Sequence, residues 1–146
     1  MKNILYITTL IFSIVLLQNC TEKEPNKIPV ISLVSMTPTT VHQYTDSVII
    51  IIHYQDKDGD IGIPDADKNS LWIQDARLVN PDEYFISPLA PIDTEVSIEG
   101  EFRIKLKNTF KLGTAAQEIT KFNIWLFDRA GNKSNILETP ELTITD

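Results

Sequence analysis

The chain has 146 residues, of which 42% are hydrophobic and 23% are charged, a composition that fits one compact domain. Its 20 acidic and 13 basic side chains give a formal charge of −7, which argues against nucleic-acid binding, because such proteins gather positive charge on one face. A single cysteine excludes an intrachain disulfide and a cysteine-based zinc site, and two histidines leave little scope for histidine-dependent catalysis or metal binding.

The first twenty residues predict an export signal. Lys2 precedes an uncharged run from Ile4 to Leu17, which is too short to span a bilayer and is typical of a signal-peptide core. Cys20 follows at the boundary with a polar segment that extends to Lys27. We expect residues 1–19 to be a cleaved signal peptide and residues 20–27 to be a short tether. The alternative is an ordinary secretory signal, or a short uncleaved anchor, in which the cysteine is incidental.

This segment resembles a bacterial lipoprotein signal, in which a diacylglycerol is attached to the cysteine before cleavage. Leu17 matches the leucine that is usual three residues before that cysteine. The resemblance implies lipidation at Cys20 and, because Thr21 rather than aspartate follows it, a lipid-anchored position at the outer membrane. The acidic body would be repelled by anionic lipids, so the acyl chains would hold it at the membrane.

From residue 28 onward the sequence breaks into short apolar or alternating runs separated by Pro, Gly, Asp and Asn, a pattern typical of an all-β domain. The β-branched run 47–54 predicts a central buried strand. Phe102, Ile104 and Leu106 alternate with charged residues and are expected to point inward. A short helical turn fits only at 115–121. Strands are expected at 30–36, 47–54, 71–78, 101–107, 121–127 and around 142–144.

Six or seven short strands in about 120 residues predict an immunoglobulin-like antiparallel β-sandwich over residues 28–146, with a small antiparallel barrel as the alternative. Residues 128–134 resemble a D-x-A-G-N-x-S turn that is common between the last two strands of bacterial immunoglobulin-like or fibronectin-like domains. Residues 49–62 resemble their strand that runs into an Asp/Gly loop. The chain is also similar to a family of small exported lipoproteins with a D-x-D-G-D-I-G segment, here residues 56–62, which has no assigned activity.

The strongest candidate site is an acidic segment, residues 56–67, which holds five aspartates and one lysine. Carboxylates at alternate positions around a glycine can surround a hard cation, and calcium accepts six to eight oxygen ligands. The segment does not fit an EF-hand, because Ile61 replaces the required glycine and no helices flank it. A solvated acidic turn and a site for an ion other than calcium are the alternatives to a calcium site.

Topology extends this candidate site to a second loop. The loops that follow the second and sixth strands of an immunoglobulin-like sandwich lie at the same end of the domain, so residues 128–132 are expected near the acidic segment. We therefore predict a calcium site. Its expected ligands are Asp56, Asp58, Asp60, Asp67, Asp128 and Asn132.

Three aromatic residues are candidates for partner binding. Tyr84 and Phe85 lie in a proline-rich connection, and Trp125 is out of phase with the inward residues of its strand, so it faces either solvent or the packing between sheets. We expect a non-enzymatic binding or structural module of the cell envelope, with an unknown envelope protein or polysaccharide as partner. The alternative is an accessory subunit or small enzyme that acts on glycans through paired carboxylates, although no nucleophile motif accompanies them.

Overall fold

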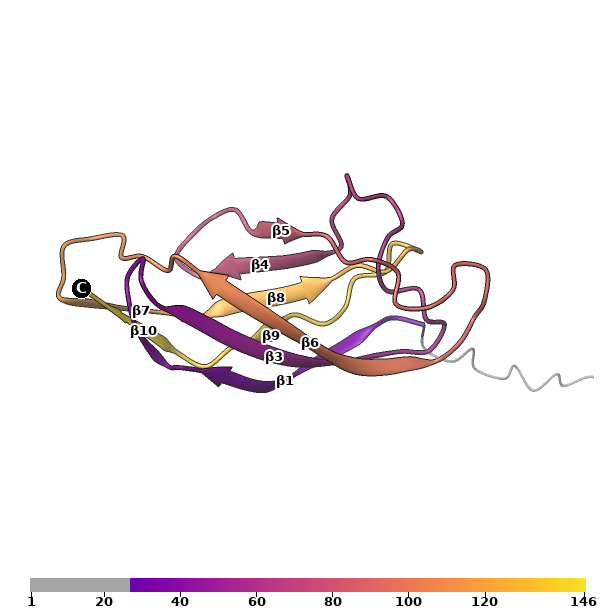
Figure 1. Cartoon of the computed structure of the whole chain (residues 1–146), viewed down its shortest axis with the longest axis horizontal. Helices are drawn as coiled ribbons and strands as arrows, with labels where there is room; N and C mark the ends of the chain where they lie inside the picture. Colours follow the sequence, from indigo (N-terminus) through magenta and orange to yellow (C-terminus); the bar gives the residue numbers. More distant parts are fainter. Residues whose placement is uncertain (1–26) are drawn as a thin grey trace, which may run out of the picture.

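The computed structural model describes residues 27–146, which form β-strands joined by turns and loops (Figure 1). The expected all-β fold is confirmed. Within these residues no helix is long and apolar enough to cross a membrane. Cys20 and the expected signal peptide lie outside the described residues.

The strands are β1 Val30–Thr37, β2 Thr40–His42, β3 Ser47–Asp56, β4 Leu71–Asp75, β5 Asp82–Tyr84, β6 Ile98–Lys107, β7 Gln117–Thr120, β8 Phe122–Leu126, β9 Leu137–Glu138 and β10 Leu142–Thr145.

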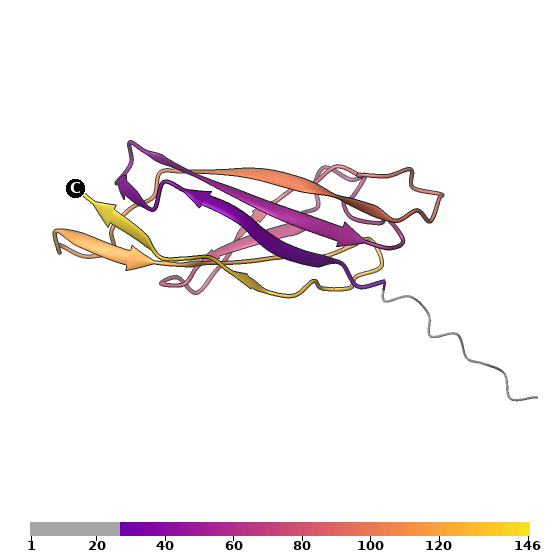
Figure 2. The same ribbon diagram turned by 90° about the horizontal axis from the view of Figure 1, so that it is seen from below.

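Two layers of strands lie face to face, so the domain is a β-sandwich (Figure 2). One layer has the strand order β1-β3-β6, and the other has the order β5-β4-β8-β9. The group β2-β10-β7 continues the second layer, because only Lys121 separates β7 from β8. The chain passes from β1 to β2 through a cis Thr37–Pro38 peptide. The pairing of β2 with β10 is parallel, and the other strand pairs are antiparallel.

The core lies between the inner faces of β3 and β8. Ile50 and Ile52 of β3 and Ile124 and Leu126 of β8 are fully buried, whereas the residues between them are partly exposed. Burial of one such side chain is worth roughly 1.5–3 kcal/mol. The β-branched run of β3 therefore supplies the central strand that the sequence predicts, and its inner face contributes Val48, Ile50 and Ile52 to the core.

The structure also contains four short strands that the sequence patterns did not predict: β2, β5, β7 and β9. Of these, β7 occupies the only segment in which the sequence left room for a short helical turn. Its residues pair with β10, with Ile119 opposite Thr143. The segment therefore forms a strand and not a helical turn, because pairing to a neighbouring strand outweighs a weak local preference in so short a segment.

Candidate metal centre

The acidic segment forms a loop at the end of β3, beside the turn that follows β8. Asp56 is the last residue of β3, and Ile61 forms an isolated antiparallel bridge with Asp128. The backbone N–H of Arg129 donates to the carbonyl oxygen of Asp60 at 3.1 Å, and the N–H of Ala130 donates to the Asp60 carboxylate at 3.0 Å. The two loops therefore lie in contact at one end of the sandwich.

Short-range hydrogen bonds fix the course of the acidic loop. The carboxylate of Asp56 accepts the backbone N–H of Asp60 at 2.8 Å, which closes the turn. The N–H of Val96, in the connection before β6, donates to the carbonyl oxygen of Asp58 at 3.2 Å. Gly59 lies between them with a φ of 73°, in the left-handed region that glycine occupies without strain. The chain is thereby bent so that alternate aspartates point to one place.

Asp56, Asp58 and Asp60 each offer a carboxylate oxygen, and these oxygens lie within 4.8 Å of one another. The Asp56 side chain is nearly inaccessible, because the residue is only 2% exposed. One oxygen of each carboxylate, Oδ1 in all three residues, is buried and accepts no hydrogen bond. A buried acceptor without a donor is costly, so three of them in one cluster point to a ligand that supplies positive charge.

Burial and repulsion among the carboxylates raise the pKa values of Asp56 and Asp60. Burial, followed by the close approach and the charge of the Asp58 carboxylate, raises the pKa of Asp56 to about 6. Burial, followed by the charges of Asp128 and Asp58, raises the pKa of Asp60. Burial and like charges both disfavour the ionised form of a carboxyl group, and a bound cation would reverse this effect.

Two basic side chains lie near the cluster without replacing such a cation. Lys27 Nζ is 4.0 Å from the Asp58 carboxylate and 3.0 Å from that of Glu95. The Arg129 guanidinium donates to the carbonyl oxygens of Gly62 at 3.2 Å and Gly59 at 3.4 Å, so it holds the backbone of the acidic loop. The buried Oδ1 atoms of the three aspartates remain without a donor even with these cations nearby.

Two members of the cluster, Asp58 and Asp60, border a hollow at the surface. The hollow has a volume of about 380 Å³, and Arg129 and Asn132 are also among the residues of its wall. An ion could therefore approach the cluster from the side of Asp58 and Asp60, and water from the hollow could complete its coordination shell.

The other expected ligands take different places. Asp128 is 3% exposed, and its two carboxylate oxygens accept the backbone N–H of Asn132 at 2.7 Å and the side-chain Nδ2 of Asn132 at 2.9 Å. These two residues therefore brace the neighbouring turn. Asp67 lies in an exposed turn, where its N–H donates to Asp65, and it is not part of the carboxylate group. The chain bends away at Gly62, whose φ is 88°, before Asp67 is reached.

Sequence reasoning missed two of the residues that hold the loop in place, Arg129 and Val96. Arg129 directly follows Asp128 in the turn that the sequence identifies, so its position could have marked it as a candidate. Its hydrogen bonds to the carbonyl oxygens of residues 67 and 70 positions earlier in the chain could not be predicted from the sequence. Val96 carried no signal, since its contact with the loop exists only in three dimensions.

The candidate partner-binding residues lie on two different surfaces. Trp125 pairs across from Trp72 and is partly exposed on the outer face of the second layer, with Lys133 Nζ 4.4 Å from its ring centroid. Tyr84 and Phe85 are 38% and 42% exposed, and both line a hollow between β5 and β6. Of these two surfaces, the one beside β6 is the less covered by neighbouring side chains.

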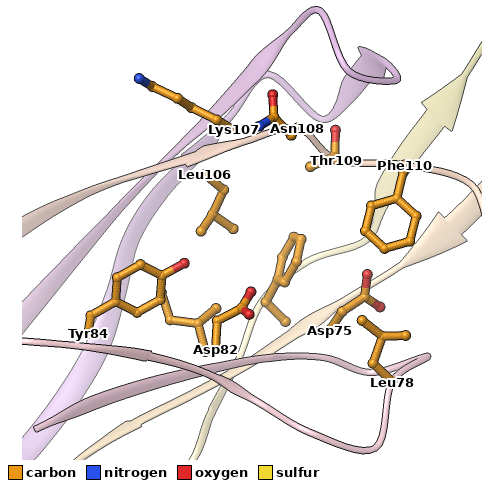
Figure 3. Close-up of a pocket in the computed structure, with 11 residues that line it drawn as sticks. Asp75, Leu78, Asp82, Tyr84, Leu106, Lys107, Asn108, Thr109 and Phe110 are labelled. Carbon is orange, nitrogen blue, oxygen red and sulfur yellow. The ribbon is translucent and has the colours of Figure 1, made fainter. Parts of the chain in front are cut away.

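A small cavity lies toward the other end of the sandwich, where β4 ends (Figure 3). Asp75 and Asp82 both line it, so these two residues are the pair of carboxylates to test against a glycosidase-like arrangement. Its volume of about 90 Å³ is far below the roughly 300–1,000 Å³ of typical small-molecule sites. Burial alone would raise the pKa of Asp75, but hydrogen bonds from Arg77 and Thr120 lower it, the opposite of what a general acid needs.

Comparison of the chain with protein-family models gives no match, and comparison with curated proteins gives none. The site must therefore be interpreted from its own geometry.

Proposed function

We propose that this protein is a lipid-anchored, non-enzymatic module of the bacterial outer membrane that binds an envelope protein or polysaccharide, and that calcium stabilises its acidic loop. The observation that supports the calcium site is the set of three buried, unpartnered carboxylate oxygens in Asp56, Asp58 and Asp60. Membrane anchoring rests on the lipoprotein-like signal that ends at Cys20.

The donor set favours calcium over softer metals. The grouped ligands are all carboxylate oxygens, without histidine or cysteine in the group, and hard cations prefer such ligands. Two oxygens bound to one calcium at 2.3–2.6 Å can be separated by at most about 5 Å. The observed spread of no more than 4.8 Å allows all three aspartates to bind the same ion.

A cation at this place would act on structure rather than on a substrate. It would cancel the repulsion among the three aspartates, and through Asp60 it would stiffen the contact with the turn at 128–132. Asp56 is too deeply buried to touch a substrate. A rigid loop end on a sandwich is a common basis for a binding surface, which is why we favour a binding module.

Calcium titration followed by thermal and chemical unfolding tests this proposal. A cation that binds only the folded state adds about 2.7 kcal/mol to the free energy of unfolding at a hundred times its dissociation constant. We expect calcium to raise the melting temperature, and a chelator to reverse the rise. No heat in calorimetry together with a melting temperature that is indifferent to calcium would show that the loop is a solvated turn.

A matched pair of double variants locates the effect. Asp58→Asn with Asp60→Asn should abolish the response to calcium, and in the absence of calcium it should not lower stability, because it removes like charges. Asp65→Asn with Asp67→Asn removes the same number of charges from the exposed turn nearby and should keep the full response. Equal responses in both variants would contradict the assignment of the ligands.

A further inference from the structure

The second edge of β6 offers an unusually long surface for strand pairing. β6 has ten residues and, within the described chain, pairs only with β3. The free edge of β1, in contrast, is protected. Its ladder with β3 is irregular between Leu33 and Ser35. The side chain of Asn135 also forms hydrogen bonds with both the N–H and the carbonyl oxygen of Ile31. An unprotected edge strand exposes backbone groups that can pair with another chain.

The exposed side chains of β6 are arranged so that two copies of the strand complement each other. Along the outer face the order is Glu99, Glu101, Arg103, Lys105 and Lys107, so the acidic residues come first and the basic residues follow. If two copies pair antiparallel with their two-fold axis at position 102, Glu99 lies opposite Lys105 and Glu101 opposite Arg103, each twice by symmetry. Parallel pairing would place like charges side by side. Opposite charges across a strand pair stabilise it, and like charges destabilise it.

An apolar hollow of about 280 Å³ runs beside this edge, between β6 and β5. Phe102 and Ile104 line it from β6, and the exposed rings of Tyr84 and Phe85 line it from the other layer. A two-fold axis perpendicular to the β6 layer would bring the β5 edge of one copy opposite the β5 edge of the other. The rings of both copies would then be covered.

We propose that this protein forms a homodimer through antiparallel pairing of β6 with β6 of a second copy, centred on Phe102. The first layers of the two copies then form one continuous six-stranded sheet, in the order β1-β3-β6-β6-β3-β1. The interface is isologous, so each favourable contact occurs twice. Tyr84 and Phe85 serve this interface, and Glu101 and Arg103 set its register.

Sedimentation equilibrium of the full chain in mild detergent, together with charge reversal on β6, tests this inference. Arg103→Glu places two like-charge pairs in the interface and should weaken dimerisation by about tenfold. Adding Glu101→Arg to that variant restores opposite charges and should restore the dimer. Lys107→Glu is the matched control, because Lys107 lies opposite Ser97 in this register and its reversal should change dimerisation little.

Phe85→Ala separates the apolar contact from the charges. This exposed side chain should be dispensable for folding, so the variant should melt normally but dimerise more weakly. A full chain that stays monomeric at high concentration would overturn the homodimer, and so would a dimer that is insensitive to Arg103→Glu. Capture of an extended segment from a different protein along β6, with no self-association, would also overturn it.

Discussion

At Gly59 the backbone of the acidic loop adopts a conformation that other residues avoid. Its φ is 73°, and a Cβ at this position would lie 2.2 Å from the carbonyl oxygen of Val96. We expect Gly59→Ala to lower the free energy of unfolding by about 2–4 kcal/mol, because it adds backbone strain of roughly 1–2 kcal/mol and forces Val96 away from the loop. Urea denaturation of the two proteins measures the difference.

Gly131 is the matched control for this substitution. Its φ is 87°, but apart from its two chain neighbours no residue has an atom within 4 Å of the place that a Cβ would occupy. Gly131→Ala should therefore cost only the backbone strain, about 1–2 kcal/mol. Equal losses at the two glycines would mean that the contact with Val96 contributes nothing to stability.

At this same scale the sequence predicts part of the candidate site. The alternation of Asp56, Asp58 and Asp60 around a glycine was sufficient to identify the group, because residues so close in the chain cannot lie far apart. The linear spacing that included Asp67 was misleading. The N–H of Ile63 donates to the carbonyl oxygen of Ile86 at 2.8 Å, and this long-range bond carries the chain away from the cluster.

Asp75 and Arg77 join strands that are distant in sequence. Arg77 donates to the Asp75 carboxylate at the end of β4 at 2.6 Å and to Glu118 of β7 at 2.7 Å. The hydroxyl of Thr120, also in β7, donates to Asp75. The side chains of Asp75 and Arg77 are only 13% and 14% exposed, so this network counts for more than a surface ion pair.

The pH dependence of stability should reveal this network. Hydrogen bonds from Arg77 and Thr120 overcome the effect of burial and lower the pKa of Asp75 below 3.8. The resulting stabilisation is therefore present above pH 3.8 and is lost as the pH falls through the lowered value. We expect Asp75→Asn to cost about 2–3 kcal/mol at pH 7, and the difference from the unsubstituted protein to shrink in acid. Urea denaturation at a series of pH values measures it.

The exposed pair of Lys121 with Glu138 provides the comparison. These side chains lie 2.9 Å apart but are 38% and 62% exposed. Glu138→Gln should therefore cost less than about 1 kcal/mol at any of these pH values. A loss as large as that of Asp75→Asn would show that solvent exposure does not distinguish the two pairs.

Strand length determined how much of the fold could be predicted. The long strands β3 and β6 contain enough residues to show their periodicity, and both were expected, although β6 begins at Ile98 rather than at position 101. The strands β2 and β9 have three and two residues, too few to show any period. Such strands exist because a neighbouring strand supplies their hydrogen bonds, and this information is not local.

Over the whole molecule, the acidic loop and the first described residues lie at the same end. Lys27 is 3.0 Å from Glu95 and 4.0 Å from Asp58, and the chain ends at the opposite end of the sandwich (Figure 2). The candidate metal centre therefore lies at the end of the domain where the described chain begins.

Lipidation itself can be tested by replacing the cysteine. Cys20→Ala should abolish fatty-acid labelling and should release the domain from the membrane fraction, because no acyl chain remains to hold an acidic body there. Cys20→Ser is a second variant that keeps the size of the side chain. Labelling that persists in both variants would contradict the lipoprotein assignment.

The parallel pairing of β2 with β10 has a mechanical consequence. Thr40, Val41 and His42 pair with Thr143, Ile144 and Thr145, so strands from near the two ends of the described chain lie side by side and run in the same direction. A force that pulls the two chain ends apart acts along these strands. It must then break the bonds of the pair together, in shear, rather than one after another. Forced unfolding depends on the height of this barrier, so the pair should make the domain resist a force that is applied at its two ends.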